Sequence, residues 1–541
     1  MDIEAFFHLL SVISYHVTEL FSCADISAFE RACGKAAQLS QFRSLIKGNT
    51  IYDLTYQLNV LEWIFARQVY PAKVLINKHW QECDLAIFSE VVSTVREIQL
   101  QGASATSKQL IGLVRFCLSP QRLCINSPTS LCETGLTSLV EACTRGNHAL
   151  VDLEFHIWYL KRTTLVAILK HCPALQALDV RKCSILDASE TLQDIVAYCP
   201  HIMSIAVDKF NGGTDDILPA MATSCKHLKR IHFESSNDTS VNLKQLPIFF
   251  AQCGPLEKVV LLGLVVSNAT MSSLAARSGL ALKVLHYTIN TRIEVSFETH
   301  FTCLRELDMT LRHYQDADQI MLDIAQHCRQ LEILVQRNCD RCTDASVLAL
   351  ATHSMQLKQL SLFRCLEFTP RALDHLVQCC TNLTLLHLTR IRSSAAEVAT
   401  MITHCKQLTS LKLGEPFLSR WDAALYAIAE QLKSLKELYL SGYHLAVSDT
   451  AVLQVVTMCK SLQILHIQNP HYVCKDVAIA RAMDSCNGSH MREFYVPSCT
   501  VRVYGALMTL VHHRAVVKQD FSFNARLNVR VGCCCSTQIF L

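Results

Sequence analysis

Apolar residues recur along this chain in one short phrase: an apolar residue, two variable residues, an apolar residue, one variable residue and a third apolar residue. Four consecutive copies begin at Leu331, Leu357, Leu383 and Leu408, which lie 26, 26 and 25 residues apart. From Leu150 to Met491 the spacing between copies stays between 22 and 29 residues. A period held over so many copies predicts a stack of like units rather than several unrelated domains.

A second pattern precedes most copies of the phrase. Apolar residues stand at positions i, i+3, i+4 and i+7, as in Leu373, Leu376, Val377 and Cys380. This spacing places four side chains on one stripe of a helix. The phrase itself alternates with period two, so its apolar side chains share one face of a strand. Because one helix and one strand cannot hide both surfaces, the pattern predicts parallel strands that stack side by side beneath outer helices.

Composition narrows the class of protein. Of 541 residues, 50% are apolar and 18% are charged, and the formal net charge is +3. This balance gives no electrostatic footprint for nucleic acid or for an anionic membrane, so we expect neither as a partner. The chain has 27 cysteines, and its acidic first residues do not resemble a secretory signal. We therefore expect thiols in a reducing compartment, the cytoplasm or the nucleus.

The segment Leu331–Ala351 resembles the cysteine-containing leucine-rich repeat. In that family a strand is followed by cysteine, then by Thr-Asp at the start of a helix that ends in cysteine; here Cys339, Thr343 and Asp344 match the loop and the helix start. Thr343 or Asp344 would cap the helix. The resemblance extends over residues 91–500 and implies an α/β fold, a leucine-rich-repeat solenoid with a curved parallel sheet and outer helices.

The N-terminal residues resemble a degenerate F-box and would form a small helical domain. The matching residues are Ser14, Tyr15, Glu19, Leu20, Cys23, Ala24, Ile26, Ser27 and Phe29. The resemblance implies a Skp1-like adaptor as partner. The apolar residues that would dock it are Leu9, Leu10, Ile13, Leu20 and Ile26. The alternative interpretation is a helical cap in which the same side chains cover the first repeat.

The patterns divide the chain into four parts. We expect F-box-like or capping helices in residues 1–45, a helical linker in 46–90, leucine-rich repeats in 91–500, and a C-terminal cap and tail in 501–541. In the tail, a helix is expected over 504–517 and a strand over 520–524. Within the repeats, residues 272–302 show no good helical stripe, and we expect a distorted unit or a local break in the curvature of the solenoid there.

Motif searches predict no catalytic, cofactor-binding or metal-binding residues. The chain has no phosphate-binding Gly-rich loop, no Gly-x-Ser-x-Gly elbow and no His-Glu-x-x-His. Cys339 and Cys342 form a lone Cys-x-x-Cys, whereas a zinc site needs a second pair. The run Cys533–Cys535 could accept palmitate, but a thiol-bearing tail explains it as well.

Residues between the apolar positions of each strand would point to the concave face of the solenoid, where a protein target would bind. Their chemistry varies from repeat to repeat, as selective binding on a rigid scaffold requires. Aromatic and Arg residues are the usual binding hot spots. The candidates for target binding are Arg337, Phe363, His387, Tyr439 and His466.

The two resemblances together imply a non-catalytic substrate-recognition subunit of an SCF-type (cullin-RING) ubiquitin ligase. The N-terminal helices would hold the adaptor, and the repeats would hold the target. The alternative is a general interaction scaffold without ubiquitin-ligase linkage. An enzyme is the reading that the sequence favours least.

Overall fold

The structure is a computed structural model, and it describes part of the chain. The described residues are 51–53, 73–77, 95–101, 106–114, 117, 120–126, 131–145, 150–183, 186–210, 212–235, 241–289, 301–311, 317–338, 340–364, 366–414, 419–442, 445–469, 472–475, 478–479, 493–496, 498–499 and 528–531. The expected helices of residues 1–45 and 504–517 lie outside these ranges, and so does the expected strand over 520–524.

The chain divides into two compact units, unit 1 (Met1–Leu256 and Val260–Leu264) and unit 2 (Glu257–Val259 and Val265–Leu541). The strands of unit 1 are β1 (Ile51–Asp53), β2 (Lys73–Asn77), β3 (Glu97–Gln101), β4 (Arg122–Asn126), β5 (Asp152–His156), β6 (Ala177–Asp179), β7 (Ser204–Val207), β8 (Arg230–Glu234) and β9 (Val241–Asn242). Its helices are α6 (Ser107–Val114), α7 (Glu133–Cys143), α8 (Arg162–His171), α9 (Ala188–Tyr198), the 3₁₀ helix η3 (Gly212–Ile217), α10 (Leu218–Ser224) and α11 (Leu246–Gln252).

Two short strands, β10 (Lys258–Leu262) and β11 (Leu264–Val265), fall at the division. The strands of unit 2 are β12 (Val284–Ile289), β13 (Glu306–Leu311), β14 (Ile333–Arg337), β15 (Gln359–Leu362), β16 (Leu385–Thr389), β17 (Ser410–Gly414), β18 (Ser419–Arg420), β19 (Glu437–Ser441), β20 (Leu445–Ala446), β21 (Ile464–Gln468), β22 (Val473–Cys474), β23 (Glu493–Val496), β24 (Ser498–Cys499) and β25 (Asn528–Val531). Its helices are α12 (Asn268–Ser278), α13 (Ala317–His327), α14 (Asp344–His353), α15 (Pro370–Cys379), α16 (Ala395–Ile402), α17 (Asp422–Gln431) and α18 (Asp449–Met458).

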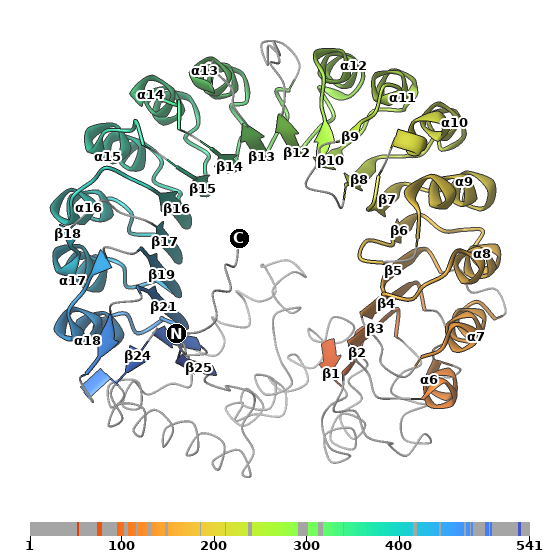
Figure 1. The fold of residues 1–541 in the computed structure, drawn as a ribbon, viewed down its shortest axis with the longest axis horizontal. Helices are drawn as coiled ribbons and strands as arrows, with labels where there is room; N and C mark the ends of the chain where they lie inside the picture. The colour runs from red at the N-terminus through yellow and green to blue at the C-terminus, as the bar shows by residue number, and fades with distance from the viewer. Residues whose placement is uncertain are drawn as a thin grey trace, which may run out of the picture. The chain divides into compact units, whose positions relative to one another are not determined.

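Strands pair in parallel within each unit. In unit 1 the ladder runs from β1 to β8 in chain order. In unit 2 it runs through β12 to β17, then β19, β21, β23 and β25. Within each unit the strands form one layer and the helices the other (Figure 1). The chain folds as an α/β solenoid of the leucine-rich-repeat type.

The sheet extends beyond residues 91–500. Strands β1 and β2 lie inside the segment 46–90, which we expected to be helical, and β2 pairs with β3 over five residues. At the other end, β25 pairs with β23 inside the expected cap, after the segment where we expected a strand. The phrase lacks its first apolar residue at these strands: Pro71 stands there before β2, and Arg526 stands there before β25.

The core of each unit lies between the helical stripe and the apolar side of the strands. In the repeat of α15 and β16, Leu373, Leu376, Leu386 and Leu388 are all buried. Each such side chain contributes roughly 1.5–3 kcal/mol of stabilisation by leaving water. Cys380, at the end of the same helix, is also buried, and burial raises the pKa of its thiol to about 12. It therefore acts as a small apolar group and not as a nucleophile.

Residues 268–278 correct one expectation. The structure has a regular helix there, α12, where we expected no good helical stripe from 272 onward. Residues 290–300 of the segment 272–302 lie outside the described residues. Ser267 caps it by accepting a hydrogen bond from the backbone N–H of Thr270. Its buried stripe includes small and polar residues, Thr270, Ala275 and Ser278 among them. A search for large apolar residues does not recognise such a stripe.

Neighbouring repeats of unit 2 are joined at their helix starts. Thr343 caps α14, as expected, by accepting from the backbone N–H of Ala345 at 3.3 Å. The Asp344 carboxylate then accepts hydrogen bonds from the backbone N–H and the hydroxyl of Thr369 in the next repeat, at 2.7 and 2.6 Å. Asp318 accepts the equivalent pair from Thr343. These bonds hold consecutive helices in register and so fix the spacing of the strands.

Candidate binding surface

Parallel pairing brings equivalent positions of successive strands together on the sheet face turned away from the helices, here called the open face. In unit 2, His387, Lys412, Tyr439 and His466 are consecutive partners in register, and Tyr495 follows His466. Adjacent strands lie about 4.8 Å apart, so side chains in such a row touch.

The first group of contacts on this face joins three residues of neighbouring repeats. The ring of Phe363, just after β15, meets the His387 ring edge-on with 4.5 Å between centroids. The guanidinium of Arg337 lies over the Phe363 ring, 5.7 Å from its centroid. Edge-to-face aromatic pairs and cation–π contacts of this kind hold side chains in one orientation.

The second group follows directly in the next repeats. The ammonium group of Lys412 lies 4.4 Å from the Tyr439 ring centroid. Tyr439 contacts His466 at 4.8 Å between centroids, and His466 contacts Tyr495 at 5.5 Å. Five of these side chains form one row in register, whereas Arg337 and Phe363 stand in the adjacent file, since Ser361 is the partner of His387. The seven side chains together are here called the aromatic ladder: Arg337, Phe363, His387, Lys412, Tyr439, His466 and Tyr495.

The ladder contains all five residues that the sequence nominated for target binding. The structure brings them to one face, in the two contact groups just described. Lys412 and Tyr495 were not nominated, although the repeat period assigns them to the same row. Lys412 and Tyr495 join the ladder through contacts with a neighbouring ring, and the repeat period alone does not reveal such contacts. Target binding by these residues stays a prediction.

His387 is partly buried and lies close to two cations. Burial, followed by the charges of Lys412 and Arg337, lowers the pKa of His387 to about 4. The imidazole is therefore neutral at neutral pH, with one nitrogen that accepts and one that donates. The ladder thus offers ring edges and faces, a neutral imidazole and two cations to an incoming partner.

The open face of unit 1 carries a different set of groups at the same positions. Arg122 contacts Glu154 at 3.0 Å and Asp152 at 3.4 Å. Arg181 contacts Asp179 at 2.6 Å. Each carboxylate of this group therefore has a cation within the same face.

A histidine extends this charged network into β8. Arg181 Nη1 lies 3.2 Å from His232 Nδ1, and His232 Nε2 lies 3.3 Å from a carboxylate oxygen of Glu234. Because a guanidinium only donates, Nδ1 accepts and Nε2–H donates to Glu234. Burial alone would raise the pKa of the Asp179 carboxyl, but hydrogen bonds from His156 and Arg181 outweigh it and hold that pKa below its usual range.

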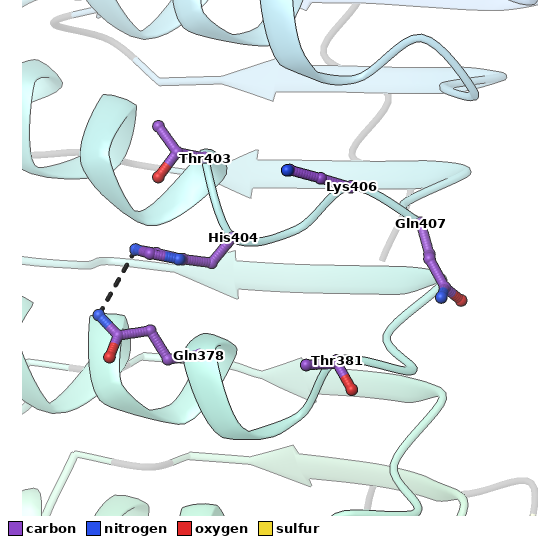
Figure 2. Close-up of a pocket in the computed structure, with 6 residues that line it drawn as sticks. All are labelled: Gln378, Thr381, Thr403, His404, Lys406 and Gln407. Carbon is purple, nitrogen blue, oxygen red and sulfur yellow. Dashed lines mark hydrogen bonds between the residues drawn. The ribbon is translucent and has the colours of Figure 1, made fainter.

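A hollow of about 370 Å³ lies between the ends of α15 and α16 in unit 2. Its lining residues are Gln378, Thr381, Thr403, His404, Lys406 and Gln407. Figure 2 shows Gln378 and His404 facing each other, with 3.4 Å between Nε2 atoms. No thiol or hydroxyl in this lining is hydrogen-bonded to His404 in the contacts that the structure describes. The hollow therefore resembles a gap between repeats rather than a reaction site.

The described part of the chain contains neither a metal-binding cluster nor a membrane-spanning helix. No group of three or more His, Cys, Asp or Glu side chains there is arranged to hold a metal ion. Cys342 is buried, whereas Cys339 and Cys533–Cys535 lie outside the described residues. None of the helices that the structure describes is long and apolar enough to cross a bilayer.

The nominated adaptor-docking residues all precede the first described strand. Leu9, Leu10, Ile13, Leu20 and Ile26 therefore lie outside the described residues. Adaptor binding through them stays a prediction from the sequence.

Comparison with known proteins yields no family model and no curated protein that matches this chain. Among solved structures, it is similar to a chain in the crystal structure of the Rad7 and Elc1 complex in yeast. The identity is 15% and the TM-score 0.40, and the match covers 74% of this chain and 88% of that one. We draw no function from a likeness at this level.

Proposed function

We propose that this protein is a non-catalytic binding protein whose aromatic ladder receives a partner protein. The observation that carries the proposal is the pair of contact groups, of three and four side chains, that lie next to each other on successive strands of one sheet. Aromatic and Arg residues in such rows are the usual anchors of protein interfaces. Because neighbouring rings already restrain one another, binding a partner would cost little side-chain entropy in the ladder.

The finer proposal is a substrate-recognition subunit of a ubiquitin ligase. It is supported by the resemblance of Ser14–Phe29 to an F-box, which would attach a Skp1-like adaptor of an SCF-type ligase. The free thiols of the cysteines whose side chains are described accord with a reducing compartment, the cytoplasm or the nucleus. A general scaffold, with the N-terminal helices as a cap, is the alternative.

Peptide selection on the full-length protein tests the binding face. Peptides from a random library should bind the wild-type chain, and Tyr439→Ser should weaken them at least about tenfold because an anchor ring is lost. Tyr426→Ser is the matched control, since Tyr426 belongs to α17 in the helical layer. Equal affinity for all three proteins would overturn the proposal.

Co-expression with a Skp1-like adaptor tests the ligase link separately. The wild-type chain should co-purify with the adaptor, and Ile13→Asp combined with Leu20→Asp should abolish the complex because two apolar contacts become charged. Tyr439→Ser should leave the complex intact. If the wild-type protein never retains the adaptor, the scaffold alternative replaces the ligase proposal.

A further inference from the structure

Five arginines gather at three consecutive strand-to-helix connections of unit 2: one is the last residue of β14, and four lie in the connections after β14, β15 and β16. They form what we call the arginine rim: Arg337, Arg341, Arg364, Arg390 and Arg392. In a parallel sheet these connections all lie at the carboxyl edge of the strands. Arg364 and Arg390 have left-handed backbone angles, with φ of 65° and 56°, in the same turn position of successive repeats.

The carboxylates around the rim are already engaged. Asp308 contacts Arg337 at 2.8 Å, Asp340 contacts Arg364 at 3.0 Å, and Glu367 lies 3.7 Å from Arg392. The acidic residues that begin the next helices are engaged as well. Asp344 binds Thr369, and Glu397 binds the backbone and hydroxyl of Ser394.

The guanidinium groups of Arg337, Arg364 and Arg392, in contrast, have more donors than these carboxylates use. Each carries five N–H groups, and a single carboxylate uses one or two of them. The side chains of Arg337, Arg364 and Arg392 are 45%, 47% and 57% exposed. Arg341 is exposed and forms no ion pair with any residue that the structure describes. What faces outward is therefore a surplus of cationic N–H donors.

Two further features favour an anionic group at this edge. Helices α14, α15 and α16 begin immediately after the three connections, and helix N-termini carry partial positive charge. The first residue of the rim, Arg337, is also the first residue of the aromatic ladder, through its contact with Phe363. A partner that reaches the ladder from this edge meets the arginines first.

The geometry points to an acidic protein segment as the partner of this edge, with Asp or Glu side chains on the arginine rim and an aromatic or apolar side chain against Phe363. This inference rests on the proposed protein-binding function and names the partner's chemistry. Carboxylates match the planar donor pairs of guanidinium groups. A nucleic acid fits less well, because its phosphates need a long track of cations and three of these arginines already contact carboxylates.

The test uses the peptides selected on the full-length protein. Selected sequences should be enriched in Asp and Glu, and Arg341→Glu combined with Arg392→Glu should weaken them at least about tenfold, because two attractive charges become repulsive. The double variant Arg341→Gln with Arg392→Gln, which removes the charges without reversing them, should weaken peptide binding less. It serves as a second variant in case the charge reversal disturbs folding. The matched control reverses two exposed lysines before the strands, at the opposite edge: Lys406→Glu with Lys460→Glu.

Each outcome is distinct. Acidic peptides that lose affinity in the rim variants and keep it in the control support the inference. Peptides that depend on Tyr439 but show no acidic excess, and bind the rim variants unchanged, overturn the inference and leave the binding function standing. Peptides that depend on neither region overturn both. If oligodeoxythymidine binds as tightly with the same rim dependence, the edge is a phosphate site and the acidic-segment inference is wrong.

Discussion

The open faces of unit 1 and unit 2 occupy the same positions of the same repeat but differ in chemistry. In unit 1 these positions carry Glu154, Asp179 and His232, and ion pairs with arginines of the same face satisfy them. In unit 2 they carry Tyr439 and His466, whose tilted rings contact one another with 4.8 Å between centroids. The same repeat positions therefore hold a charge-paired network in unit 1 and a set of ring contacts in unit 2, for which we propose a binding role.

Removing rings of the ladder should give the largest effect, because peptide affinity should fall far more than after an equivalent change on the open face of unit 1. Phe363→Ser combined with Tyr439→Ser should remove about 2–4 kcal/mol of the binding free energy of a selected peptide, because both anchors are lost. The equivalent change in unit 1, Arg181→Ala with His232→Ala, should alter the affinity no more than about twofold. Fluorescence anisotropy measures both. A similar loss of peptide affinity in the two double variants would show that the two open faces do not differ in peptide binding.

The second largest effect should be a pH dependence of stability that arises from His387 in unit 2. The folded pKa of His387 is about 4, against 6.5 for the free side chain. As pH falls below 6.5, the unfolded chain takes up a proton that the folded chain refuses, so stability decreases until pH reaches about 4. Linkage gives up to about 3 kcal/mol for this range. His387→Asn should flatten the urea-unfolding curve against pH, whereas His353→Asn, on a helix of the same unit, should not.

Breaking the charged network of unit 1 should reduce stability and not binding. Arg181→Ala leaves the half-buried Asp179 carboxylate without its guanidinium, at a cost of about 1–3 kcal/mol in the free energy of unfolding. Because the folded pKa of Asp179 is depressed, this stabilisation is present above pH 4 and is lost as pH falls below it. Urea unfolding at pH 7 and at pH 3 measures the effect. An undiminished difference between wild type and variant at pH 3 would show that another contact is responsible.

Removing the charge of Lys412 should have the smallest effect. Lys412→Met takes away a cation that lowers the pKa of His387, so that pKa should rise. The loss of stability between pH 7 and pH 4 should then be smaller than in the wild type, because less of the titration gap remains. Lys406→Met, at the edge of the same unit, should leave the pH profile unchanged. If Lys412→Met leaves the dependence of stability on pH unchanged, the charge of Lys412 does not lower the pKa of His387.

The repeat period predicts much of this surface. Spacing alone assigns Tyr439 and His466 to one row, because each repeat adds one strand in register. Contacts that depend on side-chain rotamers are not encoded in the period. The flexible Lys412 side chain could have extended into solvent, and the bond between Arg181 and His232 joins residues 51 positions apart. The helix at 268–278 escaped prediction because Thr270 and Ser278 fill positions where large apolar residues were expected.

Site-specific photo-crosslinking tests the central claim most directly. Benzoylphenylalanine in place of Tyr439, of His232 or of Tyr426 probes the ladder, the unit 1 face and the helical layer in turn, with one selected peptide as partner. We predict crosslinks from the position of Tyr439, abolished by excess unlabelled peptide, and none above background from the other two. Equal or stronger crosslinking from the position of His232 or Tyr426 would contradict the assignment of the ladder as the binding surface.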